Sequence, residues 1–323
     1  LTGTLVGTPI VNSLIILVGT LLASWMGTTG AAMLLIRPLI RANVNRQNKV
    51  HVIVFFIFLV ANIGGSLTPL GDPPLFLGFL KGVDFFWTTK AMLLPMLFMV
   101  VSLLSIFFML DSFYYKKENI PSGLKLEAGH KLGLKGTFNL FLLLGVISAV
   151  LASGFWKPHV SFNIYYVHLE LQNIVRDILL LSLAYISWTM TPMTIREENE
   201  FTWFPIVEVG KLFAGIFVTI IPAIAILKAG SYGALSTLVG SVSNDAGPVN
   251  IMYFWLTGIL SSFLDNAPTY LVFFNTAGGN PVALMGELHT TLLAISLGAV
   301  AMGGLTYIGN APNFMVKSIA EET

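Results

Sequence analysis

The chain has 323 residues, of which 55% are hydrophobic and only 10% charged, and its mean hydropathy is +0.81. Soluble globular domains carry about 25% charged residues, so this composition indicates an integral membrane protein and excludes a soluble enzyme or a disordered chain. The absence of cysteine excludes disulfides and thiolate metal sites. A net charge of +1 offers no electrostatic footprint for nucleic acid.

The first two apolar segments are both interrupted. Residues 9–40 contain Gly27-Thr28-Thr29-Gly30, which divides them into two arms of roughly a dozen residues, whereas a membrane crossing needs about 20. This pattern predicts a re-entrant helical hairpin. Residues 50–80 are long enough to span, but Gly64-Gly65 and Gly71-Asp72-Pro73-Pro74 break the helix midway.

Uninterrupted apolar segments occupy the middle of the chain. Full-length spans are predicted near 91–113, 136–156, 173–193 and 204–228. The stretch 157–176 mixes aromatic and charged residues, so we expect it to lie at the membrane interface.

The two interrupted patterns return near the end of the chain. Residues 251–278 form two short arms around Asp265-Asn266-Ala267-Pro268, and residues 290–320 are broken at 303–312. The later pair aligns with the earlier one at a constant offset of 238, and nine of the twenty positions 57–76 hold the same residue in both copies. The chain therefore contains an internal repeat.

Basic residues in the connecting loops predict the orientation of each repeat. Loop 41–49 contains Arg41, Arg46 and Lys49, whereas loop 279–288 contains no Lys or Arg. The positive-inside rule places the first loop in the cytoplasm and the second outside. We therefore expect an all-α polytopic membrane protein with two inverted repeats, each made of a re-entrant hairpin and a broken transmembrane helix.

The offset also predicts a segment that the chain does not contain. The span 91–113 follows the first broken helix, and its counterpart would be residues 329–351. The chain also begins at Leu1, within an apolar run. We expect it to be part of a longer protein.

The breaks hold the candidate ligands. Non-helical backbone at membrane depth is tolerated where it lines a cavity or holds a ligand, and broken helices in inverted repeats are typical of secondary transporters. The candidate binding residues are Thr28, Thr29, Ser66, Thr68, Asp72, Asp265, Asn266, Thr269, Thr306 and Asn310. Hard cations take such oxygen ligands. The subset expected to hold sodium is Asp265, Asn266, Asp72, Thr68 and Thr306.

Each acid has an alternative role. A carboxylate within a membrane span is costly and is a functional candidate by default, but it can also cap the N-terminus of a half-helix. Asp72, directly before Pro73-Pro74, fits a cap well, so Asp265 is the stronger candidate for ion binding. His51 and His289 occupy matched positions, and we expect interfacial residues there rather than proton relays.

Three motifs resemble those of the ion transporter superfamily: NIGGSLTPLGDPP at 62–74, LDNAPT at 264–269 and GGLTYIGNAP at 303–312. That group includes citrate and dicarboxylate transporters, arsenite permeases and sodium:proton antiporters of the NhaD type. The chain is most similar to bacterial members called sodium:proton antiporters or citrate transporters.

The resemblance implies a transport domain, a scaffold domain and a homodimer that works by an elevator motion. In this chain it implies transport-domain repeats at 1–90 and 248–323, with scaffold and connecting helices at 91–247. The family's carboxylate transporters carry Ser-Asn-Thr at the hairpin tips, whereas the tips here read Gly27-Thr28-Thr29 and Asp265-Asn266-Ala267-Pro268-Thr269.

The leading functional hypothesis is sodium/proton antiport around Asp265 and Asp72. A carboxylate buried away from water favours its protonated form, so it can exchange a proton for a cation. Sodium-coupled uptake of citrate or another small carboxylate is the alternative, and an intramembrane aspartyl protease is a remote one. We expect no cofactor beyond sodium, and a multi-pass protein of the inner (plasma) membrane whose partners are sodium, protons, lipid and a second copy.

Overall fold

A computed structural model gives the fold. It describes residues 5–118, 133, 135–156, 158, 160–164, 167–198, 201–203 and 247–321, with scattered positions between 207 and 244. Much of the span expected at 204–228 therefore lies outside the described residues. The chain divides into two compact units, one of residues 132–203 with the first two residues and one of residues 3–131 with 204–323.

The larger unit is almost entirely helical. Its elements are α1 (Pro9–Met26), α2 (Thr28–Ala42), α3 (Val50–Leu59), η1 (Ile63–Leu67), α4 (Pro73–Leu80), α5 (Phe85–Lys117), α10 (Ser236–Val242), α11 (Asn250–Phe263), α12 (Asn266–Thr276), α13 (Pro281–Met285), α14 (His289–Met302), η4 (Gly303–Leu305) and α15 (Ala311–Glu321). Two short strands, β3 (Ser243–Asn244) and β4 (Gly247–Pro248), pair antiparallel before α11.

The first helix pair turns sharply at a glycine. Helix α1 begins after Thr8, whose hydroxyl oxygen accepts a hydrogen bond from the amide of Val11 at 3.3 Å, and Pro9 occupies the first helical position. Gly27 lies between the two helices with a φ of +83°, which residues with a Cβ rarely adopt. The arms have 18 and 15 residues rather than a dozen, because α1 continues unbroken from its cap to Gly27.

Both broken helices fold back closely at glycines. A Cβ atom on Gly71 would collide with the backbone of Gly65, and one on Gly309 would collide with the carbonyl of Gly303. These positions therefore require glycine for close backbone approach. The predicted breaks at 64–74 and 303–312 are present, each as a 3-10 turn followed by extended residues.

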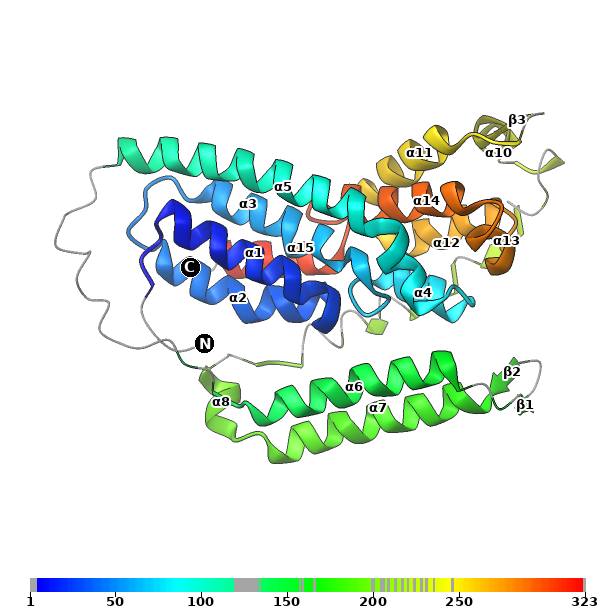
Figure 1. The fold of residues 1–323 in the computed structure, drawn as a ribbon, viewed down its shortest axis with the longest axis horizontal. Helices are drawn as coiled ribbons and strands as arrows, with labels where there is room; N and C mark the ends of the chain where they lie inside the picture. Colours follow the sequence, from blue (N-terminus) through cyan, green and yellow to red (C-terminus); the bar gives the residue numbers. More distant parts are fainter. Residues whose placement is uncertain are drawn as a thin grey trace. The chain divides into compact units, whose positions relative to one another are not determined.

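The turn of each helix pair contacts a broken helix through the same backbone hydrogen bond. The amide of Thr28 donates to the carbonyl of Gly71 at 2.8 Å, and the amide of Asn266 donates to Gly309 at 3.0 Å. The donors are 238 residues apart, and so are the acceptors. In Figure 1 the α1–α2 pair and the α11–α12 pair extend in opposite directions from the middle of this unit.

A pair of threonine hydroxyls repeats in the same way. Thr68 donates to the carbonyl of Ser24, and Thr306 donates to the carbonyl of Ser262. Each bond fixes the extended part of a broken helix to the first arm of the neighbouring helix pair. Residues 238 positions apart in the two repeats therefore make equivalent contacts, besides being of the same type.

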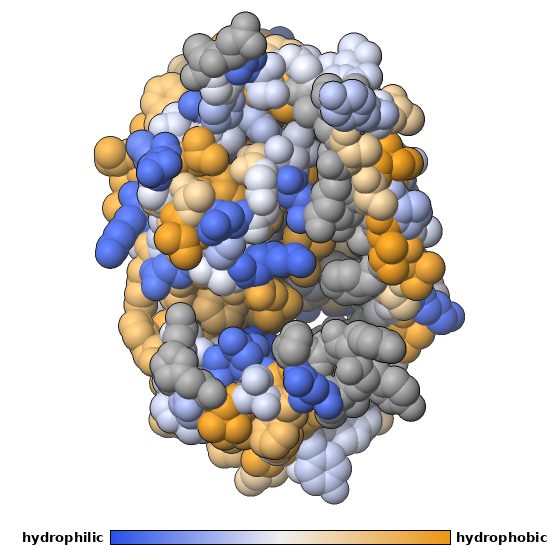
Figure 2. Space-filling model, turned by 90° about the vertical axis from the view of Figure 1, so that its right-hand side faces the viewer, coloured by the Kyte–Doolittle hydropathy of each residue, from blue (hydrophilic) through white to orange (hydrophobic). Residues whose placement is uncertain are grey.

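The surface is apolar along the long helices. Among the described residues, four helical stretches are long and apolar enough to cross a membrane: Pro9–Met26, Val50–Leu67, Phe85–Lys117 and Phe138–Phe155. Figure 2 shows extensive apolar areas, interspersed with polar residues, on the face in view. The fold is that of an all-α membrane protein, as the composition predicts.

The smaller unit consists of a helix pair with a β-hairpin at one end. Helix α6 (Phe138–Phe155) packs along α7 (Leu171–Met190), and the short helix α8 (Met193–Glu198) follows. Strands β1 (Ser161–Ile164) and β2 (Val167–Glu170) pair antiparallel, with Ser161 opposite Glu170. Part of the segment expected at the membrane interface is thus a β-hairpin, and α7 begins directly after it.

Candidate ion-binding site

Asp72 lies at the centre of a buried polar cluster where the four chain breaks meet. Its Oδ1 accepts hydrogen bonds from the Thr28 hydroxyl at 3.3 Å and from the Asn310 amide at 3.0 Å, and its Oδ2 accepts one from the Asn266 amide at 2.8 Å. All four side chains are at most 1% exposed. The three donors belong to the first helix-pair turn, the second broken helix and the second helix-pair turn.

Two further asparagines extend the cluster. The Oδ1 of Asn62 accepts from Asn310 at 3.1 Å, and its Nδ2 donates to the Oδ1 of Asn313 at 2.6 Å. Asn62 and Asn313 were not among the residues predicted from the sequence, although both break the repeat, with Val300 and Leu75 as their counterparts. An asparagine in one repeat whose equivalent position in the other repeat holds an apolar residue is the sequence signal that could have identified them.

Two amide oxygens in the cluster have no hydrogen-bond partner among the described residues. They are the Oδ1 atoms of Asn266 and Asn310, whose Nδ2 atoms donate to Asp72. A buried polar atom without a partner costs about 1–3 kcal/mol. No Lys, Arg or His among the described residues donates to the Asp72 carboxylate. The cluster thus combines a carboxyl group with free oxygen ligands, which suits a small hard cation.

Asp265 makes a different contact from Asp72. Its carboxylate accepts a hydrogen bond from the amide of Ala267 at 2.9 Å and caps helix α12. No hydrogen bond in the described part of the chain joins it to Asp72. Ion binding by Asp265 stays a prediction, and the contacts place Asp72 at the centre of the polar cluster.

The other candidate hydroxyls mostly donate to backbone carbonyls. Thr68 and Thr306 donate to Ser24 and Ser262, Ser66 donates to Ile63 at 2.6 Å, and Thr269 donates to Asp265 at 3.0 Å. Thr29 is exposed. These side chains shape the chain breaks around the Asp72 cluster, whereas Thr28 alone among the candidate hydroxyls donates to the carboxylate.

A second buried polar cluster lies where α1, α3 and α5 meet. The carboxylate of Asp111 accepts hydrogen bonds from Arg46 at 2.7 Å, His51 at 2.8 Å and Asn12 at 3.0 Å. Asn12 and Asn43 exchange two amide hydrogen bonds of 2.9 and 2.8 Å. This cluster ties the ends of the first helix pair to α5, and sequence analysis gave it no role.

The two matched histidines lie in different surroundings. The His51 side chain is 10% exposed and paired with Asp111, which is more buried than the interfacial position expected for it. His289 is exposed at the start of α14, with its ring 3.4 Å from the hydroxyl of Thr290. The repeat therefore matches these histidines in sequence but not in environment.

The apolar helices and the chain's family together define a helical membrane transporter, not an enzyme. All of residues 1–323 match the family described as "Putative citrate transport". The chain belongs to that family, which confirms the resemblance of its motifs to the superfamily of citrate and ion transporters. No curated protein matches the chain significantly. The intramembrane protease hypothesis finds no support in this family.

Proposed function

We propose that this protein is a secondary transporter that couples the movement of a cation, most simply sodium, to the transport of citrate or a related small carboxylate. The observation that carries the proposal is the buried Asp72 carboxylate, which receives three side-chain hydrogen bonds and none from a basic residue among those described. A bound cation would neutralise this charge. Family membership supports citrate as the solute class.

The proposed cation site consists of Asp72 with the free amide oxygens of Asn266 and Asn310. Each amide already donates its Nδ2 hydrogen to Asp72, which leaves its oxygen for a ligand. Because these residues belong to separate chain breaks, a cation at this point would draw the two repeats together. Binding would thus couple ion occupancy to the conformation of the whole site.

The arrangement of the repeats supports transport by alternating access. The backbone and threonine hydrogen bonds that recur at an offset of 238, together with the loop charges, support two inverted repeats with re-entrant hairpins. The proposed transport-domain repeats are residues 1–90 and 248–323, with scaffold and connecting helices between them. A homodimer in the inner membrane that works by an elevator motion completes the proposal.

Sodium/proton antiport is the second candidate function. A polyanionic substrate would favour Arg or Lys at its site, and no basic side chain among the described residues donates to Asp72. In antiport a proton and a sodium ion would compete for the Asp72 carboxylate, with no organic solute involved.

Flux through reconstituted proteoliposomes separates the two candidates. The coupled-transport proposal predicts that an inward sodium gradient drives accumulation of labelled citrate. Antiport predicts instead that the sodium gradient drives proton efflux, reported by a trapped pH-sensitive dye, whether or not citrate is present. Absence of both sodium-driven fluxes in liposomes that contain folded protein would contradict the proposed function.

A further inference from the structure

Asn62 joins the two repeats through a network of side-chain amides beside the Asp72 cluster. Its Nδ2 donates to the carbonyl of Ile57 at 2.8 Å and to the Oδ1 of Asn313 at 2.6 Å. Its Oδ1 accepts a hydrogen bond from the Nδ2 of Asn310 at 3.1 Å. Because both hydrogens of its Nδ2 have acceptors, the amide of Asn62 presents its oxygen to Asn310.

Asn313 fixes this orientation from the second repeat. Its Nδ2 donates to the carbonyl oxygens of Gly303 at 2.9 Å and Thr306 at 3.0 Å, which leaves its Oδ1 to accept from Asn62. If the Asn313 amide were turned over, its oxygen would face two carbonyl oxygens in a buried place, which costs free energy. The orientation of Asn313 therefore determines that of Asn62.

Asn310 lies at the end of this network. Its Nδ2 is within hydrogen-bond distance of three oxygens, on Ala61 at 3.2 Å, Asn62 at 3.1 Å and Asp72 at 3.0 Å. Its Oδ1 has no partner among the described residues. A turned amide would bring the Asn310 oxygen against those three oxygens and would present hydrogens, rather than an oxygen, to a cation.

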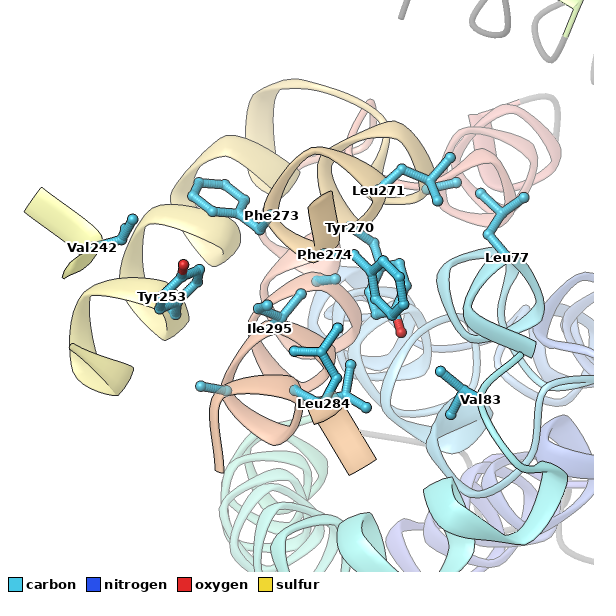
Figure 3. Close-up of a cluster of buried hydrophobic side chains, with 14 residues drawn as sticks. Leu77, Val83, Val242, Tyr253, Tyr270, Leu271, Phe273, Phe274, Leu284 and Ile295 are labelled. Atoms are coloured by element: carbon cyan, nitrogen blue, oxygen red, sulfur yellow. The ribbon is translucent and has the colours of Figure 1, made fainter. Parts of the chain in front are cut away.

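Asn266, the other amide of the proposed cation site, is positioned by apolar packing. It begins α12, which enters a buried apolar cluster through residues that include Tyr270 and Phe274. Figure 3 shows these side chains within that cluster. Helix α15, which follows Asn310, has no residue in the cluster, and one of its buried side chains is Asn313. Hydrogen bonds thus position Asn310 where apolar packing positions Asn266.

The repeat shows that an apolar pair can replace the two asparagines of the network. The residues 238 positions from Asn62 and Asn313 are Val300 and Leu75, and both belong to one small buried apolar cluster. The equivalent pair between the repeats is therefore apolar. The polar pair lies on the side of Asn310, the amide that it orients.

We propose that Asn62 and Asn313 are positioning residues, which hold the Asn310 amide with its oxygen available to the cation. This inference rests on the cation site proposed above. It adds that the affinity of the site depends on a contact between the two repeats, made by side chains that do not themselves bind the ion.

Binding of radioactive sodium to the purified protein in detergent tests this inference. Asn62→Val introduces the residue of the other repeat and should raise the Kd for sodium by about 10- to 100-fold, the usual effect of losing a partner that orients a metal ligand. The number of sites per protein should stay the same. A merely structural role would instead lower the number of sites and leave the Kd of the remaining folded molecules unchanged.

Asn313→Leu tests the same network from the second repeat, and it should raise the Kd for sodium in the same way. The double variant should have a Kd no higher than the weaker-binding single variant, because both substitutions release the same amide. Val300→Ala is the matched control at the apolar counterpart of Asn62. It should lower the melting temperature and leave the Kd for sodium unchanged.

A wild-type Kd in folded Asn62→Val and Asn313→Leu variants, measured beside a wild-type protein that binds sodium, would overturn the inference and leave the proposed function standing. Absence of sodium binding to the folded wild-type protein would contradict the proposed cation site itself, and the inference with it.

Discussion

Two aspartates that precede half-helices use their side chains in opposite ways. Asp265 caps α12 through the amide of Ala267, whereas Asp72 makes no capping bond to α4. The reason is local: Pro73 and Pro74 fill the first two helical positions and have no N–H to donate. The Asp72 carboxylate instead joins the polar cluster, so the capping role that the sequence offered as an alternative is absent.

The capping role of Asp265 can be tested by two substitutions. Asn caps helices about as well as Asp, so Asp265→Asn should keep thermal stability, and its transport then tests the ion-binding role predicted for the carboxylate. Asp265→Ala should lower the free energy of unfolding by about 0.5–2 kcal/mol. Thermal unfolding in detergent and flux in proteoliposomes measure the two effects. Loss of flux in a stably folded Asp265→Asn variant would support the predicted ion ligand, whereas wild-type flux would leave Asp265 with the capping role alone.

For individual residues, the sequence predicted which residue types gather at the site better than it predicted which hydrogen bonds each side chain makes. Asp72, Asn266, Asn310 and Thr28 were among the candidates, and these four form the cluster. The hydroxyl of Thr68, predicted to bind the ion, donates its hydrogen to a backbone carbonyl, and ion binding by its oxygen stays a prediction. Sequence position cannot decide which way a hydroxyl points, because the competing carbonyl belongs to a distant helix.

The broken helices depend on glycines that allow close backbone contact. Gly71→Ala should lower the free energy of unfolding by at least about 1–3 kcal/mol, because its Cβ would collide with backbone atoms that cannot rotate away. Gly30→Ala is the matched control. A Cβ there would lie 3.7 Å from the nearest atom, so this helical substitution should be neutral or stabilising by up to about 1 kcal/mol. Equal thermal stability of the two variants would contradict the observed packing of the break.

The cluster around Asp111 should fix the first helix pair to α5. Arg46→Gln leaves two acids, Asp111 and Glu118, without their buried cationic partner, and breaking a buried ion pair in this way costs about 3–5 kcal/mol. The control is Lys317→Gln, which removes an exposed ion pair worth at most about 1 kcal/mol. Thermal unfolding should show a large loss of stability for Arg46→Gln only. A similarly small loss of stability in both variants would mean that the buried cluster around Asp111 contributes little to the stability of the fold.

Sequence patterns located the elements but not their limits. Interruptions by Gly and Pro marked both chain breaks, since these residues act directly on the backbone. The arms of the first helix pair were predicted too short: α1 runs unbroken to Met26, and α2 already begins at Thr28, inside the predicted interruption. The β-hairpin at 161–170 was not predicted, because each strand has only four residues and its alternation is too short to be distinctive.

For the molecule as a whole, the proposed inverted orientation of the repeats predicts that their loops are accessible from opposite sides of the membrane. Single cysteines at Asn45 and Glu287 are suitable probes, since both positions are exposed and the chain has no other cysteine. A membrane-impermeant maleimide added to intact cells should label position 287 but not position 45. In inside-out vesicles the pattern should reverse. Labelling of both positions from the same side would contradict inverted repeats.

Binding of the coupling ion by Asp72 can be measured as sodium-driven flux in proteoliposomes. Asp72→Asn keeps the shape of the side chain but removes its charge, so it should reduce sodium-driven citrate uptake, or sodium-driven proton efflux, by more than about tenfold. Asp84→Asn is the control, because it makes the same change at an exposed residue. Asp84 caps α5, and Asn can make the same cap. The control should leave the flux unchanged. Wild-type flux in a folded Asp72→Asn protein would contradict the account.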